Sequence, residues 1–184
     1  MNFFSIFLGL FVANMWKQYW NTLAYPPSDK LQSTIGSIGL VFNGMRFIWS
    51  MLLDHYSYKS VYGSMLVLEI LIAFTFPLVV NYTWIYVCYI CIGYLCLGGH
   101  FTLLPNVCKQ IFGDKATLVY SYLYTYAGVT GVAECLIQIF LMTSNNLEFF
   151  FYLYGGFSVL SLILLIFWFD PTPYNNRTES LTDY

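Results

Sequence analysis

Four ionisable side chains lie inside long apolar runs of this 184-residue sequence: Arg46, Glu69, His100 and Glu134. The first interrupts the run LVFNGMRFIWSMLL. An isolated arginine at the centre of a membrane helix costs about 2.5 to 3.5 kcal/mol to insert. Something must therefore compensate Arg46, and the candidates are a carboxylate of the same chain, water in a cavity, or an anionic ligand.

Two interpretations of Arg46 stay open at this point. In the first, the guanidinium pairs with Glu69 or Glu134 and fixes the register of the helices. In the second, it faces a cavity and receives a small carboxylate, because its planar fork matches a carboxylate through two parallel hydrogen bonds. Asn43 and Trp49 lie three residues on either side of Arg46. Both share its helical face, which is therefore polar and aromatic.

His100 is the one imidazole deep within an apolar run, and an imidazole changes its charge near neutral pH. It is either a proton-linked switch or a side chain that bonds to a neighbouring helix. The sequence alone does not choose between these two roles.

The composition indicates a membrane protein. The chain is 59% hydrophobic and 21% aromatic but only 9% charged, whereas a soluble domain carries about 25% charged residues. Its net charge is −2 and its basic residues are scattered, so the chain has no cationic face for nucleic acid. Nucleic-acid binding is therefore excluded.

Six apolar stretches of roughly 20 residues predict an all-α, polytopic membrane bundle with six transmembrane helices. Polar and apolar residues do not alternate as in the strands of a membrane barrel. We expect one transmembrane domain, residues 1–169, followed by a polar C-terminal tail, residues 170–184. The protein is thus expected to be an integral, multi-pass protein of a membrane that the sequence does not specify. The predicted spans are 2–20, 32–53, 61–80, 84–105, 118–142 and 148–169.

The reactive side chains give little support for metal binding, redox chemistry or enzymatic catalysis. Cys88 and Cys91 form a C-x-x-C motif, but it lies in a predicted span with no second Cys or His pair nearby. We interpret both as packing residues, and we expect no metal and no cofactor. An enzyme would need clustered His, Asp or Glu at a helix end, and only the neighbours Asp54 and His55 fit. We expect the chain not to be an enzyme.

A short polar segment after the second predicted span resembles the loop signature of the major facilitator superfamily, G-x-x-x-D-[RK]-x-G-[RK]-[RK]. Asp54 and Lys59 match the signature. Ser50 and Ser57 replace its glycines, and His55 replaces a basic residue. In that superfamily the signature joins helices two and three and recurs, degenerate, between helices eight and nine. The resemblance implies that Asp54 and Lys59 form an inner-loop gate, which latches the loop against helix ends.

The stretch GGHFTLLPNVCKQIFGDKATLVYSYLYTYAGVTGV, 98–132, is similar to the oxalate/formate antiporter and monocarboxylate transporter branch. That branch reads roughly G-G-x-F-x-x-x-P, then F-G, then Y-[TS]-A-x-G-V-x-G in helix eleven. Its members bind the substrate carboxylate through an arginine midway along helix eight, and Arg46 occupies the equivalent place. The resemblance implies a substrate site of Arg46 with Asn43, Tyr126 and Tyr124. The helix-eleven lysine used for oxalate has no counterpart beside Tyr126, so a monocarboxylate is the expected substrate.

The resemblance covers nearly the whole chain as the C-terminal six-helix half of such a transporter. It implies secondary active transport of a small organic anion, with Glu134, His100 and Glu69 as candidates for ion coupling. Alternating access in this fold rocks two six-helix halves around a site between them. We therefore expect a second half as partner: a missing N-terminal half, a second copy, or another chain. The alternative is a non-transporting structural subunit of a membrane assembly, which predicts that Arg46 is buried against Glu69 or Glu134.

Overall fold

The computed structural model describes residues 2–22, 27–141 and 147–170, and these residues form helices and turns with no strand. The all-α prediction is therefore confirmed for the described part of the chain. The helices are α1 (Asn2–Trp20), α2 (Asp29–Gly44), α3 (Phe47–Leu53), α4 (Tyr58–Val79), α5 (Thr83–Phe112), the 3-10 turn η1 (Gly113–Lys115), α6 (Ala116–Phe140) and α7 (Leu147–Phe167).

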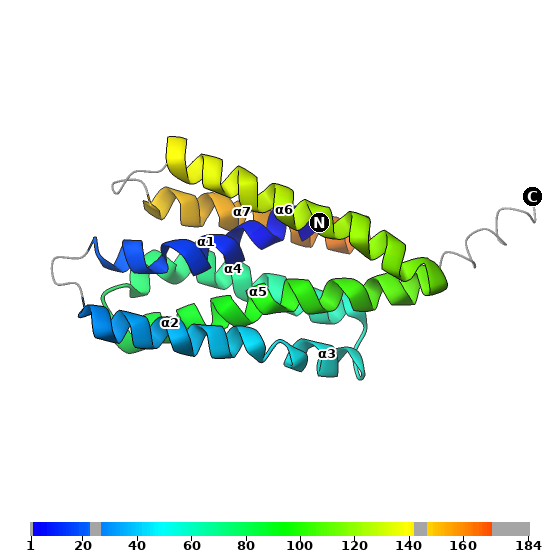
Figure 1. Cartoon of the computed structure of the whole chain (residues 1–184), viewed down its shortest axis with the longest axis horizontal. Helices are drawn as coiled ribbons and strands as arrows, with labels where there is room; N and C mark the ends of the chain where they lie inside the picture. Colours follow the sequence, from blue (N-terminus) through cyan, green and yellow to red (C-terminus); the bar gives the residue numbers. More distant parts are fainter. Residues whose placement is uncertain (1, 23–26, 142–146, 171–184) are drawn as a thin grey trace, which may run out of the picture.

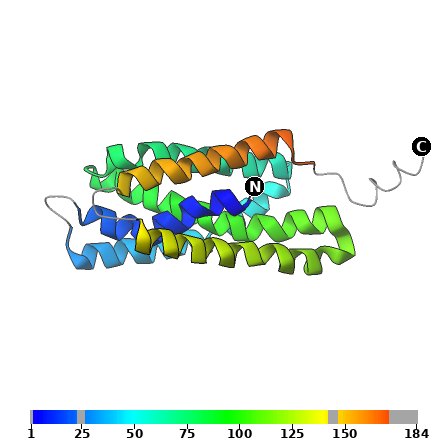
Figure 2. The ribbon, with the colours of Figure 1, turned by 90° about the horizontal axis from the view of Figure 1, so that it is seen from above.

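The long helices run side by side along one axis, and α1 occupies the middle of the bundle (Figures 1 and 2). α1 contacts α4, α5, α6 and α7, each of which follows it in the chain. α4 packs along α7, and α2 packs along α5. α5 and α6 fold back on each other as a helical hairpin through η1. The bundle therefore has a central helix with the other helices around it.

Aromatic side chains fill one half of the core. The Phe76 and Phe151 rings stack with their centroids 4.4 Å apart, and the Trp20 and Tyr86 rings lie 4.7 Å apart. The Tyr86 hydroxyl donates a hydrogen bond of 2.7 Å to the carbonyl oxygen of Trp16. A buried ring adds a large contact area, and a bonded hydroxyl leaves no polar atom without a partner. These contacts join α1, α4, α5 and α7.

Specific residues define where the helices begin and end. The side chains of Ser28 and Ser57 cap α2 and α4 by accepting hydrogen bonds from the backbone three residues later. Gly113 ends α5 with a φ of +53°, a backbone conformation that glycine adopts without steric strain. The prediction that Pro105 ends the fourth span is wrong, because α5 continues through Pro105 to Phe112.

The second predicted span is also interrupted. The chain makes a turn at Met45 and Arg46, so residues 32–53 form two helices, α2 and α3, and not one. Gly44 comes directly before this turn, and glycine disfavours a helix by about 1 kcal/mol relative to alanine. The two helices still form one apolar stretch of 25 residues, Asp29–Leu53.

Four stretches of the described residues are long and apolar enough to cross a membrane: Asp29–Leu53, Tyr58–Val79, Thr83–Phe140 and Leu147–Phe167. The 58 residues of Thr83–Phe140 comprise both arms of the α5–α6 hairpin. The helical part of the membrane prediction is thus confirmed, whereas the described residues contain four stretches of this kind and not the six predicted spans. Of the predicted C-terminal tail, only Asp170 lies within the described residues.

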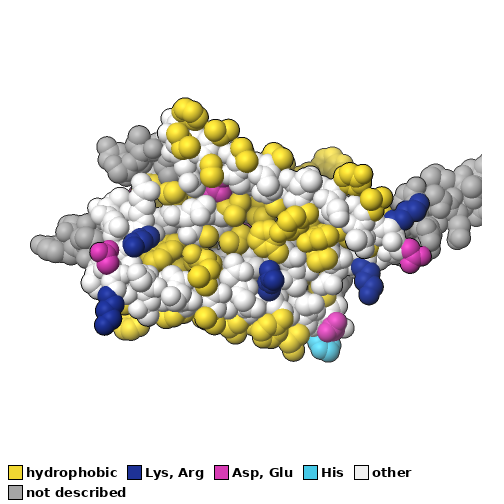
Figure 3. Space-filling model, viewed as in Figure 1, with side chains coloured by type: hydrophobic (Ala, Val, Ile, Leu, Met, Phe, Trp, Pro, Cys, Tyr) yellow, Lys and Arg dark blue, Asp and Glu magenta, His cyan; other side chains and the backbone are white. Residues whose placement is uncertain are grey.

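Large apolar side chains are exposed along the outside of the bundle, as expected of helices that contact lipid. In Figure 3 hydrophobic side chains spread over the face shown, while most acidic and basic side chains gather toward its two ends. Such a distribution suits a bundle whose middle lies in hydrocarbon and whose ends lie in water. The most exposed of these side chains are Trp84, Trp168, Phe167, Phe140 and Ile139.

Candidate functional site

The turn between α2 and α3 presents Arg46 to the outside of the bundle. Backbone bonds of the 3-10 type tighten this turn: Arg46 N–H donates to Asn43 at 3.3 Å, and Trp49 N–H donates to Arg46 at 3.1 Å. The Trp49 indole is buried and donates to the carbonyl oxygen of Leu95 in α5 at 2.9 Å. This bond anchors α3 to α5. Asn43, Arg46 and Trp49 all lie beside Gly98 and Gly99 of α5, so they share one side of the chain although the helix is interrupted between them.

Arg46 forms no ion pair with a described carboxylate, and its side chain is exposed. The guanidinium is close enough to the Tyr120 hydroxyl in α6 for the two groups to interact electrostatically. Tyr124 follows one turn later, with its ring 5.4 Å from that of Tyr120 and 5.9 Å from that of Phe101. The Arg46 side chain is therefore exposed on the outside of the bundle, near aromatic side chains of α6.

A close approach between α2 and α5 sets the position of this turn. Gly98 in α5 faces it, and a Cβ atom on Gly98 would lie 2.6 Å from the backbone oxygen of Asn43 and 2.9 Å from the Arg46 Cβ. Real side chains do not approach backbone so closely. Only glycine at position 98 therefore permits the observed placement of Arg46.

We expect Gly98→Ala to destabilise the protein by about 1 to 3 kcal/mol, because overpacking forces α2 away from α5. Gly128→Ala is the matched control, since nothing lies within 4 Å of its Cβ position in α6. That control should be neutral or stabilising by up to about 1 kcal/mol. Thermal unfolding of both variants in detergent measures the difference, and equal midpoints would contradict the proposed close approach.

Among the described residues, one acidic and one basic side chain lie within salt-bridge distance of each other: Glu69 and His100, in the core. The imidazole carries a charge only when it is protonated. The His100 Nε2 atom lies 2.6 Å from Glu69 Oε1, and the two side chains are 0% and 2% exposed. Ser158 of α7 donates to the other carboxylate oxygen at 3.3 Å. On the far side of the imidazole, Tyr62 Oη lies 3.5 Å from His100 Nδ1 and 2.7 Å from Ser5 Oγ. A chain of polar groups thus connects α1, α4, α5 and α7.

Glu134 occupies a second buried position, in α6. Its Oε1 atom accepts a hydrogen bond of 2.9 Å from Gln138, one turn later. Asn14 of α1 lies beside the carboxyl group, whose Oε2 atom is buried without a hydrogen bond to a described residue. Glu69 and Glu134, the two carboxylates considered as partners of Arg46, therefore contact other groups.

Tyr126 lies apart from the other predicted substrate residues. It borders a cavity that also involves Asn2 and Tyr58, and neither Arg46, Asn43 nor Tyr124 contributes to the walls of that cavity. Tyr124 and Tyr126 are two positions apart, so they point to different faces of α6. Arg46 and Asn43 lie close together, near Tyr120 and its neighbour Tyr124. Tyr126 instead borders the separate cavity.

The loop between α3 and α4, residues 54–57, lies at one end of the bundle (Figure 1). The Lys59 ammonium group donates a hydrogen bond of 2.7 Å to the carbonyl oxygen of Ile166, near the end of α7. A cation at this position compensates the partial negative charge of a helix C-terminus. Asp54 borders a polar pocket of about 300 Å³ with Ser50 and Asn106.

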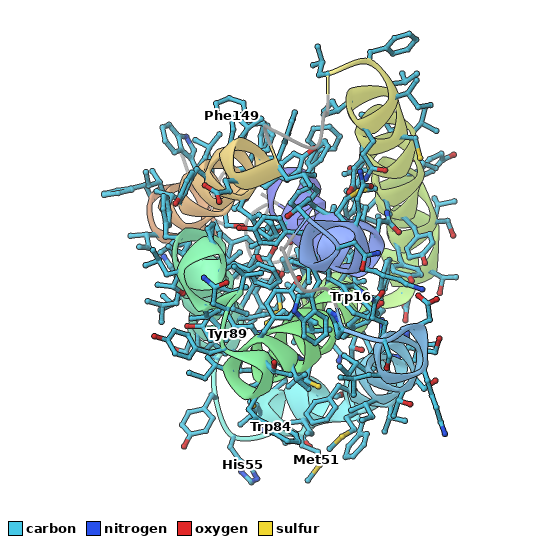
Figure 4. The ribbon with its side chains drawn as sticks, turned by 90° about the vertical axis from the view of Figure 1, so that its left-hand side faces the viewer. Trp16, Met51, His55, Trp84, Tyr89 and Phe149 are labelled. Atoms are coloured by element: carbon cyan, nitrogen blue, oxygen red, sulfur yellow. The ribbon has the colours of Figure 1, made fainter. Side chains whose placement is uncertain are left out.

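The His55 and Met51 side chains project outward from the lower edge of the bundle in Figure 4. The exposed His55 therefore does not turn toward a reactive cluster.

Within the described ranges, no three His, Cys, Asp or Glu side chains are close enough to hold a metal ion. Cys88 is exposed and Cys91 is buried, so the C-x-x-C motif faces two environments.

No family model, curated protein or solved structure matches this chain. Sequence reasoning missed Ser5, Tyr62 and Ser158, whose polar groups surround the buried pair. The available signal was that each one is a hydroxyl inside an apolar run.

Proposed function

We propose that the chain is one six-helix half of an alternating-access carrier that moves a small organic anion of the monocarboxylate type. Arg46 binds the carboxylate, with Asn43 and Tyr124 as neighbouring contacts. The observation that carries this proposal is an exposed arginine, past the middle of an apolar stretch, without a carboxylate partner among the described residues. A structural subunit predicts the opposite arrangement, in which Arg46 is buried against Glu69 or Glu134.

The proposal counts six spanning helices, two more than the four apolar stretches, on two grounds. Thr83–Phe140 reverses direction at η1, so it supplies two crossings, α5 and α6. α1 supplies the sixth, since its 19 residues measure about 28 Å at 1.5 Å per residue, close to the ~30 Å of a hydrocarbon core. Other helices surround α1, which explains how a less apolar helix is tolerated.

A second half is part of this proposal. One bundle supplies one wall of a central site, and a carrier needs two walls that rock against each other. The exposed face that carries Arg46 is the wall, and the facing half is a second copy, another chain or an N-terminal half. The Lys59 contact with α7 and the Asp54 loop would form the inner latch of this half.

Reconstitution into liposomes tests the proposal. The chain, alone and with any six-helix partner that co-purifies with it, should take up radiolabelled lactate or formate above empty liposomes. A choline control should show no uptake, because a guanidinium repels a cation. If neither preparation transports a monocarboxylate, the carrier assignment fails and the structural-subunit alternative gains support.

A further inference from the structure

A cavity of about 400 Å³ lies where the start of α1 meets α4, the last turns of α5, and α6. α1 begins short of the end of the bundle at which α5 and α6 turn, so the α5–α6 hairpin extends beyond it (Figure 1). The walls of the cavity are mainly apolar and include Leu104, Val107 and Leu123. Binding sites for small molecules have volumes of about 300 to 1,000 Å³. This cavity is therefore large enough for a small apolar ligand.

Two polar atoms on its walls are buried without a hydrogen bond to a described residue. They are the Tyr58 hydroxyl and the Asn2 Oδ1 atom. Tyr58 is only 3% exposed. The Asn2 side chain lies close enough to the hydroxyl oxygens of Tyr58 and Tyr126 to act as a donor toward both, which leaves the Tyr58 hydrogen and Asn2 Oδ1 as the free donor and acceptor. Buried polar groups normally have partners, and a donor and an acceptor left free together point to a ligand that supplies both.

The chemistry of the walls defines the ligand. No described lining residue carries a charge, so an anion or a cation would be buried there without compensation. A single hydroxyl fits both free groups, because its hydrogen is donated to Asn2 Oδ1 while its oxygen accepts the Tyr58 hydrogen. We propose that this cavity binds a neutral, long-chain alcohol, with its hydroxyl between Asn2 and Tyr58 and its chain against α5 and α6. The site does not depend on Arg46 or on transport.

Photolabelling of the purified full-length chain in detergent tests this site. A dodecanol that carries a diazirine on its chain should label residues of α5 and α6 at the cavity, located by peptide mass spectrometry. Tyr58→Phe removes one neutral hydrogen bond, so we expect labelling at low probe concentration to fall about three- to tenfold. Leu123→Trp should block labelling by filling the cavity from α6.

Two matched variants and two competitors complete the experiment. Tyr82→Phe and Leu118→Trp change exposed side chains outside the cavity walls, so both should label like the unmodified chain. Unlabelled dodecanol should compete more strongly than dodecane or dodecanoate, which lack the neutral hydroxyl. Equal competition by dodecane would overturn the role of the hydroxyl. Labelling that is spread evenly over exposed residues, or that persists in Leu123→Trp, would overturn the site.

Discussion

Replacement of Arg46 by alanine is expected to lower monocarboxylate uptake by about tenfold to a hundredfold. This range follows from a charge-assisted hydrogen bond worth roughly 1.5 to 3 kcal/mol and about 1.4 kcal/mol per factor of ten. Arg46→Lys keeps the charge but loses the planar fork, so we expect intermediate uptake. The measurement is the initial rate of labelled lactate or formate entry into proteoliposomes.

Two controls make the Arg46 result specific. Lys30→Ala removes another exposed cation, in the first turn of α2, and should leave the uptake rate unchanged. Because Arg46 is exposed and forms no ion pair with a described residue, Arg46→Ala should also unfold at nearly the same temperature as the unmodified protein. A fully active Arg46→Ala chain would remove this residue from the site and leave the carrier assignment standing.

Removal of either member of the Glu69–His100 pair is expected to destabilise the protein strongly. Glu69→Leu or His100→Leu leaves a buried polar partner without its 2.6 Å contact. Breaking a buried pair in this way costs about 3 to 5 kcal/mol. For a chain of this size we expect the unfolding midpoint to fall by roughly 6 to 20 °C, at 2 to 4 °C per kcal/mol. Tryptophan fluorescence during heating in detergent measures the change.

The double variant distinguishes two causes of lost stability: a polar group left without its partner, and a change in side-chain volume. Replacing both Glu69 and His100 by leucine removes both polar groups, and an apolar replacement of a whole buried pair is often nearly neutral. We therefore expect the double variant to be more stable than either single variant. Asp29→Ala, which changes an exposed carboxylate at the start of α2, should shift stability by less than about 1 kcal/mol. Additive losses in the double variant would show that the pair is not energetically coupled.

The helices were predictable from the sequence, whereas their interruptions were not. Long apolar runs impose helices in a membrane because each backbone group must find its partner within the segment. The turn at Met45 and Arg46 depends on tertiary contacts, namely the close approach of Asn43 to Gly98 and the bond from Trp49 to Leu95. Pro105 was expected to stop α5, but helix packing tolerates a proline inside the helix.

The candidate site was predictable in its residue types but not in its pairings. The four ionisable positions stand out against apolar sequence, yet which of them meet depends on how each helix is rotated within the bundle. Glu69 turns toward His100, and Glu134 bonds within its own helix to Gln138. The separation of Tyr126 from Arg46 follows from the same rotation of α6. The sequence therefore indicates which ionisable residues lie within apolar runs, but it does not indicate which of them contact one another.

The central position of α1 has a consequence for biosynthesis. Within this chain α1 is translated before the helices that it contacts, so most of its buried residues rest against segments that are made later. The apolar side chains of α1 therefore lack their packing partners until α4, α5 and α7 have been synthesised. A stalled nascent chain that ends before α5 would leave the rings of Phe11 and Trp16 unshielded and recognisable to membrane quality-control proteases.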